Sequence, residues 1–196
     1  MITTTHIVTH ALIAWGRRPR RLLGTRATRR AFIAGGLAPD LGLALMSAGA
    51  FACYPLVRGQ SLPTTFALVY DELFYTSPVW IAAHNVLHAP LVIAALYLLG
   101  RRTRRRWSAG LRAFAGGCAL HTLMDIVVHH DDGPLLLFPL EWTVRFSSPL
   151  SYWDPAHHGD VIGPIDLAIT VVGSAVLLIG HLLNRRGRRP PPAGVV

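Results

Sequence analysis

The chain has 196 residues, of which 52% are hydrophobic and 15% charged, and its mean hydropathy is +0.39. This composition excludes a typical soluble globular domain and indicates an integral membrane protein. The net charge of +9 is compatible with DNA or anionic-lipid binding, but all the basic residues are arginines and seventeen of the nineteen lie in three short stretches. Without interleaved aromatic residues, these stretches are better read as markers of membrane topology, and we expect no nucleic-acid partner.

The sequence predicts an all-α fold, a polytopic membrane bundle of about five transmembrane helices. The apolar stretches behind this prediction are residues 2–16, 31–57, 79–100, 109–128 and 162–184. The first is short, whereas the others approach or exceed the length of about 17 to 25 residues that crosses the hydrocarbon core. We expect one transmembrane domain over residues 1–184, with an outer loop at about 129–161, and a basic, proline-rich, disordered tail over residues 185–196.

The arginine clusters follow the first, third and fifth apolar stretches, so they share one side of the membrane if every stretch spans. They comprise Arg17, Arg18, Arg20, Arg21, Arg26, Arg29 and Arg30, the six arginines from Arg101 to Arg112, and Arg185, Arg186, Arg188 and Arg189. Because basic residues in short loops stay cytoplasmic, we expect the N-terminus outside and the C-terminus inside, in a bacterial cytoplasmic (inner) membrane. The start, MITTTHIVTH, lacks the features of a cleaved signal peptide, so we expect it to be retained.

Ionisable side chains within the predicted spans indicate function, because such groups are costly in a membrane. His84 and His88 stand four residues apart, and so do His121 and Asp125, so each pair projects from one face of a helix. At a rise of about 1.5 Å per residue, His84 lies about 10 Å and His121 about 12 Å below the outer surface. The two pairs can therefore meet in the bundle core and hold a metal ion.

Three further residues can complete this ligand shell. His6 and His10 enter on the first stretch from the same outer side and reach a comparable depth. Asp40 would lie about 25 Å below the outer surface, so we expect it to join only if its helix ends near Gly49 or breaks at Pro39 and the neighbouring glycines. For any one histidine, the alternative is a buried side chain that hydrogen-bonds to a neighbouring helix.

The predicted outer loop concentrates more candidates: His129, His130, Asp131, Asp132, Asp154, His157, His158 and Asp160. It is either a solvated acidic loop with turn-forming proline and glycine, or a lid that adds ligands, a proton shuttle or substrate contacts to the site. We take Asp125, Asp40, His129 and His130 as the catalytic candidates. Which carboxylate acts as the general base stays open.

Several short motifs occur in a fixed order. They are TTTH at His6, the pair Pro39 and Asp40, HNVL at His84, and the HxxxD element of His121 and Asp125 followed by LLLFP up to Pro139. This order resembles the membrane-bound metal-dependent hydrolase family whose best-known bacterial member is LexA-regulated. A closer resemblance is to small bacterial membrane proteins that share an HxxxDxxxHHDD element and the words SYWD and HHG. Where the hydrolase family usually has a further histidine before His84, this chain reads SPVWIAAH, and His88 or His10 is the candidate substitute.

The resemblance implies a metal-dependent hydrolase. We expect one or more divalent ions, zinc first and manganese or iron next, held by His84, His121 and Asp125 with help from neighbouring histidines and Asp40. Such a site lies at the depth of lipid headgroups, which predicts membrane lipids as its surroundings and a lipid-like ester or phosphoester as substrate. The alternatives are a non-enzymatic protein that binds or transports a metal ion, proton or haem through the same cluster, and a scaffold whose polar groups only join helices. The oligomeric state stays open.

Overall fold

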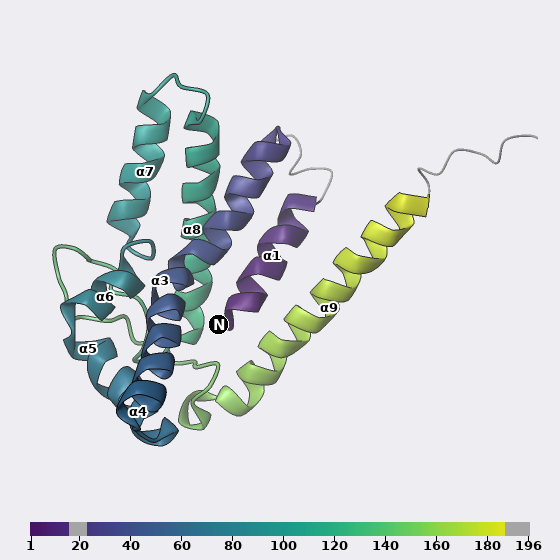
Figure 1. Ribbon diagram of the computed structural model, residues 1–196. Helices are drawn as coiled ribbons and strands as arrows, with labels where there is room; N and C mark the ends of the chain where they lie inside the picture. The colour runs from purple at the N-terminus through teal and green to yellow at the C-terminus, as the bar shows by residue number, and fades with distance from the viewer. Residues whose placement is uncertain (16–22, 187–196) are drawn as a thin grey trace, which may run out of the picture.

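The computed structural model describes residues 1–15 and 23–186, and every regular element in that part of the chain is helical, which confirms the all-α class (Figure 1). The α-helices are α1 (Thr3–Trp15), α3 (Arg26–Arg58), α4 (Leu62–Ala67), α5 (Phe74–Thr76), α6 (Pro78–Asn85), α7 (Pro90–Arg102), α8 (Ser108–Val128) and α9 (Gly159–Arg186). A π-helix, η1 (Leu68–Leu73), joins α4 to α5, and a 3-10 helix, η2 (Pro155–His157), precedes α9. Arg17, Arg18, Arg20, Arg21 and residues 187–196 of the predicted tail lie outside the described residues.

Three helices, α3, α8 and α9, are long and apolar enough to cross a membrane, and α6 with α7 makes a fourth candidate if the bent pair counts as one span. These lengths and hydropathies indicate a membrane protein. The predicted number of five spans stays a prediction, because α1 has only 13 residues and a helix needs about 17 or more to cross the hydrocarbon core.

The predicted third span is not one continuous helix. α6 ends at Asn85, α7 begins at Pro90, and the two are bent by 50° relative to each other. Ala89 has φ −69° and ψ 123°, because the residue before a proline is sterically kept out of the helical region. This break places His88 in a turn rather than on a helix.

Residues 58–77, which the sequence places between two spans, are largely helical. α4 begins after Ser61, whose side chain accepts a hydrogen bond from the Thr64 N–H, and has a proline in its first turn, both of which are common helix-start signals. The segment folds back on the C-terminal half of α3, where Ala50, Val69 and Trp80 form a small apolar core. It therefore provides a wall beside the lower part of α3 (Figure 1).

Glycines set the distance between the central helices. A Cβ on Gly35 of α3 or on Gly117 of α8 would lie 2.2 Å from a backbone oxygen of the facing helix. A Cβ on Gly36 would lie 2.4 Å from the ring of His10, so α1 also packs close to α3. Small residues that allow backbones to approach in this way are typical of membrane helix interfaces. The close packing brings the polar side chains of α1, α3 and α8 together.

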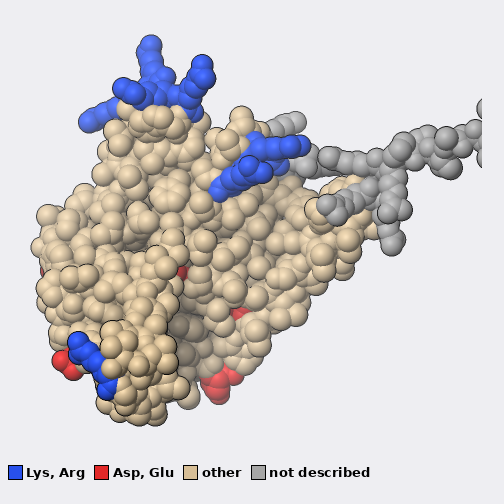
Figure 2. Space-filling model, viewed as in Figure 1, with Lys and Arg blue, Asp and Glu red and all other residues tan. Residues whose placement is uncertain are grey.

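The described arginines lie mostly at one end of the bundle. Figure 2 shows most of them in two groups, over the connection from α7 to α8 and near the beginning of α3, and a further blue group at the opposite end beside α4. α9 ends at the same end as the two larger groups (Figure 1). The segment from α4 to α5 and the beginning of α9 lie at the other end. The arrangement has the arginine asymmetry that the sequence predicts, while the orientation in a cell stays a prediction.

Candidate metal centre

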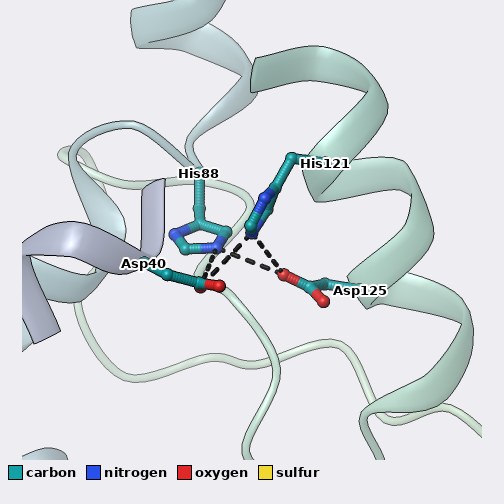
Figure 3. A group of neighbouring side chains, drawn as sticks. All are labelled: Asp40, His88, His121 and Asp125. Atoms are coloured by element: carbon teal, nitrogen blue, oxygen red, sulfur yellow. Dashed lines mark hydrogen bonds and ion pairs between the residues drawn. The ribbon is translucent and has the colours of Figure 1, made fainter. Parts of the chain in front are cut away.

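Four side chains from three segments meet inside the bundle, and we call them the inner group (Figure 3). Asp40 comes from α3, His88 from the turn between α6 and α7, and His121 and Asp125 from α8. One nitrogen or oxygen atom of each residue lies within 4.8 Å of those of the others, and all but the half-buried Asp40 are buried. Two imidazoles and two carboxylates form a donor set that can hold a divalent metal ion.

Backbone carbonyls fix both rings of the inner group. Nδ1 of His121 donates to the Gly36 carbonyl at 2.9 Å, across the close contact between α3 and α8. Nδ1 of His88 donates to the His84 carbonyl at 2.5 Å. Because a carbonyl can only accept, Nδ1 carries a proton in each ring, and Nε2 of a neutral ring has a free lone pair. Metal-binding histidines are commonly oriented in this way.

Both Nε2 atoms are directed toward carboxylates. Nε2 of His121 lies 3.0 Å from Oδ2 of Asp125 and 3.3 Å from Oδ1 of Asp40. Nε2 of His88 lies 3.2 Å and 3.7 Å from the same two oxygens. Nε2 of His121 is buried and makes no hydrogen bond of normal geometry despite these distances. Lone pairs that face carboxylates in a buried site are unfavourable unless positive charge lies between them, so the residues present fit a bound cation.

Asp125 is the hub of the group, with 4% of its surface exposed. Its second oxygen, Oδ1, lies 2.9 Å from Nε2 of His6 and 3.4 Å from Nε2 of His129. The His6 ring also stacks on His121, with centroids 3.6 Å apart. The structure thus brings His6 and His129, both predicted site residues, to the edge of the inner group.

Asp40 joins the inner group although its helix neither ends near Gly49 nor breaks at Pro39, which were the two conditions expected from the sequence. α3 runs from Arg26 to Arg58 without interruption, with Pro39 inside it. The expected separation of Asp40 from the other ligands was wrong, because it took the end of α3 as the outer surface, whereas the last turns of α3 continue past the site and pack against α4 and η1. Thr3 donates to Oδ2 of Asp40 at 2.7 Å; sequence reasoning missed it, although its spacing of three from His6 was an available signal.

Two predicted ligands lie beside the inner group rather than in it. The His10 ring is held between the carbonyls of His6 and Gly117, at 2.7 and 3.0 Å, so its nitrogens join α1 to α8. The buried His84 ring contacts His88 at a centroid distance of 4.8 Å and has no partner for Nδ1. It lines a cavity that opens at the inner group.

His129 connects the inner group to the outer loop. Its Nδ1 lies 3.0 Å from Oδ1 of Asp132, and Oδ2 of Asp132 accepts from the Trp153 indole at 2.9 Å. Burial disfavours the charged imidazole, but the pairs with Asp125 and Asp132 outweigh it and raise the pKa of His129. Burial likewise opposes ionisation of Asp132, but the hydrogen bond with His129 outweighs it and lowers the pKa of Asp132.

His130, a predicted catalytic residue, belongs to a separate outer cluster that consists of His130, Asp154 and His157. Its Nδ1 donates to the Ser148 carbonyl at 2.6 Å, and its ring stacks on His157 with centroids 3.4 Å apart. Nδ1 of His157 lies 2.7 Å from Oδ2 of Asp154. The structure does not bring this cluster to the inner group. Asp131, His158 and Asp160 also lie outside the inner group.

No protein-family model, curated protein or solved structure matches the chain. Fold and site therefore define its class: an all-helical protein with helices long and apolar enough to span a membrane. More particularly, the described part of the chain encloses a His/Asp group that could hold a metal ion. The resemblance to membrane-bound hydrolases stays a prediction.

Proposed function

We propose that the protein is an integral membrane metal-dependent hydrolase that acts on a lipid-like ester or phosphoester at the outer side of a bacterial inner membrane. The observation that carries the proposal is the convergence of the Nε2 atoms of His88 and His121 on the carboxylates of Asp40 and Asp125 within the bundle. A divalent ion held there, zinc first and manganese or iron next, would polarise an acyl or phosphoryl oxygen and lower the pKa of a bound water.

The chain's own residues have separable roles in this proposal. His88 and His121 bind through Nε2 because their Nδ1 atoms already donate to carbonyls. Thr3 holds Asp40 in place. His129 can move a proton between Oδ1 of Asp125 and Oδ1 of Asp132, toward the outer loop. The site therefore has both a charge-stabilising centre and a route for a proton.

The main alternative is a protein that carries a metal ion or proton through the same residues, since proton relays and ion paths in membranes use such chains. Haem bound between these imidazoles is disfavoured. The rings of His88 and His121 contact each other with centroids 4.9 Å apart, and His6 stacks on His121. No gap for a porphyrin separates the rings.

Metal analysis and hydrolysis assays on the purified protein test the proposal. We expect about one zinc, manganese or iron per chain, and hydrolysis of p-nitrophenyl acyl or phosphodiester substrates that is lost on chelation and restored by the metal. His121→Ala should lose metal and activity, whereas His181→Ala, an exposed position on α9, should keep both. Bound metal without hydrolysis of either substrate class would favour the carrier, and a Soret band would reject the proposal.

The orientation is tested separately with reporter tags at the C-terminus and in the loop around Trp142. We expect the C-terminal tag in the cytoplasm and the loop tag outside, because the arginine-rich end of a membrane protein stays in the cytoplasm. Both tags on one side would overturn the outer-side placement.

A further inference from the structure

A cavity of about 630 Å³ opens at the inner group and extends well beyond it. Asp40, Asp125 and His84 lie at its polar end. Its remaining lining comes largely from α3 and from the segment α4 to α5 that folds back on α3. Figure 2 shows this face of the molecule hollowed between α4 and the beginning of α9. The cavity is larger than a small polar substrate at the inner group would fill.

The α3 wall of the cavity is apolar between two polar residues. Asp40, Leu43, Ala44 and Ser47 all line it, and their spacing of three, four and seven residues places them on one helix face. The rise of a helix separates Asp40 from Ser47 by about 10 Å. The cavity therefore extends about that far from the inner group along α3.

Aromatic side chains form the facing wall. Phe66, Tyr70 and Phe74 line the cavity from α4, η1 and α5, and the rings of Phe66 and Tyr70 lie 4.8 Å apart. The Tyr70 hydroxyl donates to Oγ of Ser47 at 3.0 Å, which ties the two walls together at the end remote from Asp40. An apolar chain is the ligand that such walls accommodate.

The charge of the lining indicates the head group. Besides Asp40 and Asp125, the cavity is lined by Asp71 and Asp132, no arginine lines it, and the Met1 amino group that does line it is already paired with Oδ1 of Asp125 at 3.1 Å. Asp132 is paired with His129, so a divalent ion at the inner group would leave Asp71, which is exposed and makes no ion pair among the described residues, as the unpaired carboxylate of the lining. An anionic head without a positive group would meet the Asp71 carboxylate unfavourably, whereas a phosphate followed by an ammonium group would match the metal and Asp71 in turn.

We infer that this cavity binds a zwitterionic amphiphile with a single apolar chain, its head group at Asp40 and Asp125 and its chain between Leu43, Ala44, Phe66 and Tyr70. The inference names the substrate class for the proposed hydrolase and in that sense rests on it. It assigns chain-length selection to Ala44 and Ser47, because larger side chains there would shorten the apolar part without touching the inner group.

Competition against radiolabelled lysophosphatidylcholine, with the full chain in maltoside micelles, tests the inference. The competitors are butyl-, octyl- and dodecyl-phosphocholine, with dodecyl phosphate as the anionic comparison. Affinity should rise with chain length in the wild type, and dodecyl-phosphocholine should compete better than dodecyl phosphate. In Ala44→Phe and Ser47→Leu, we expect the dodecyl compound to lose about tenfold in affinity and the butyl compound to change less than about twofold.

Ala52→Phe is the matched control, because Ala52 is an exposed position on the same helix; it should leave the affinities unchanged. Metal content, expected to stay at the wild-type level in all three variants, shows that the inner group is intact. Unchanged affinities in both cavity variants, or an equal loss for short and long chains, would overturn the inference. If the protein binds longer chains more tightly but holds no metal and hydrolyses neither substrate class, the inferred ligand is supported and the proposed hydrolase function is rejected.

Discussion

Among the described residues, the inner group and the outer cluster both bring histidine and aspartate side chains together, but the inner group alone is arranged to attract a metal ion. In the inner group, two buried Nε2 atoms converge on two carboxylates because backbone carbonyls occupy both Nδ1 atoms. In the outer cluster, His157 pairs with Asp154, His130 donates to a carbonyl, and both rings are partly exposed. The same residue types therefore have different chemistry, which is set by burial and by what each Nδ1 donates to.

The largest expected effect is that of Asp125→Asn, which tests the inner group. Asp125 is the carboxylate that four imidazoles approach within 3.4 Å. Its loss should reduce metal affinity by more than the roughly 100-fold typical of supporting residues. It should also lower the free energy of unfolding of the metal-loaded protein by about 3 kcal/mol, because a buried cation would lose a charged partner. Metal content and thermal unfolding in detergent measure the two effects.

Asp154→Asn is the matched change in the outer cluster and should leave the metal content unchanged. Equal metal loss in the two variants would mean that the outer cluster also contributes to binding. Equal retention would remove the inner group as the metal site.

A smaller but still large effect is expected from Gly117→Ala. The added Cβ would lie 2.2 Å from the Phe32 carbonyl oxygen, so α3 and α8 must separate, at a cost of about 1–3 kcal/mol. Separation would also pull the Gly36 carbonyl away from Nδ1 of His121 and weaken metal binding. Gly116→Ala, where a Cβ meets nothing within 4 Å, is the control. Indistinguishable unfolding midpoints for the two variants would contradict this account of the helix contact.

Asp166→Ala should have a moderate effect through α1. Asp166, on α9, is 2% exposed and accepts from the Ile2 N–H at 2.9 Å, while its carbonyl accepts from Thr5. These bonds hold the start of α1, which carries Thr3 and His6 to the inner group. We expect a loss of stability of about 1 kcal/mol together with weaker metal retention.

Asp160→Ala, at an exposed position in the first turn of the same helix, is the control for Asp166→Ala and should change neither property. A variant at Asp166 that loses stability but binds metal with wild-type affinity would show that α1 need not be held there for the site to form.

The smallest effect is a pH dependence of the outer cluster. The hydrogen bond from His157 lowers the pKa of Asp154. A carboxyl group whose pKa is lowered on folding stabilises the folded state at any pH above the ordinary pKa of aspartate. This stabilisation is lost as the pH falls through the lowered pKa. Asp154→Asn should therefore unfold at a slightly lower temperature than the wild type at neutral pH, and the two should converge in acid. If the difference in unfolding temperature between wild type and variant became larger in acid, the His157 hydrogen bond would not be the cause of the lowered pKa of Asp154.

The part of the site that depends on local periodicity could be predicted from the sequence. His121 and Asp125 lie one turn apart on a helix whose structure, Ser108–Val128, closely follows the predicted stretch 109–128. That helix has no internal proline, so its apolar length and the spacing of four residues suffice to place both side chains on one face.

The other positions in the site depend on helix breaks and on contacts between helices, which cannot be deduced by treating each apolar stretch as one regular helix. The sequence treats His84 and His88 as equal partners, but the break before Pro90 puts only His88 in the inner group. The proline was a visible signal. The choice between His6 and His10 had no such signal, because it depends on which ring meets the carbonyl of Gly117 on another helix.

The length of α3 sets the height at which the cavity meets the membrane. Its 33 residues rise about 50 Å, against a hydrocarbon thickness of about 30 Å, and the usual tilt of up to about 40° accommodates only part of this hydrophobic mismatch. In the proposed membrane setting, α3 would therefore extend beyond the hydrocarbon, and its C-terminal turns, with exposed Leu56 and Val57, would lie at the level of the lipid headgroups together with α4 if the excess lies at that end. For the proposed hydrolase, this placement predicts that a lipid enters the cavity sideways from the leaflet without passing through water.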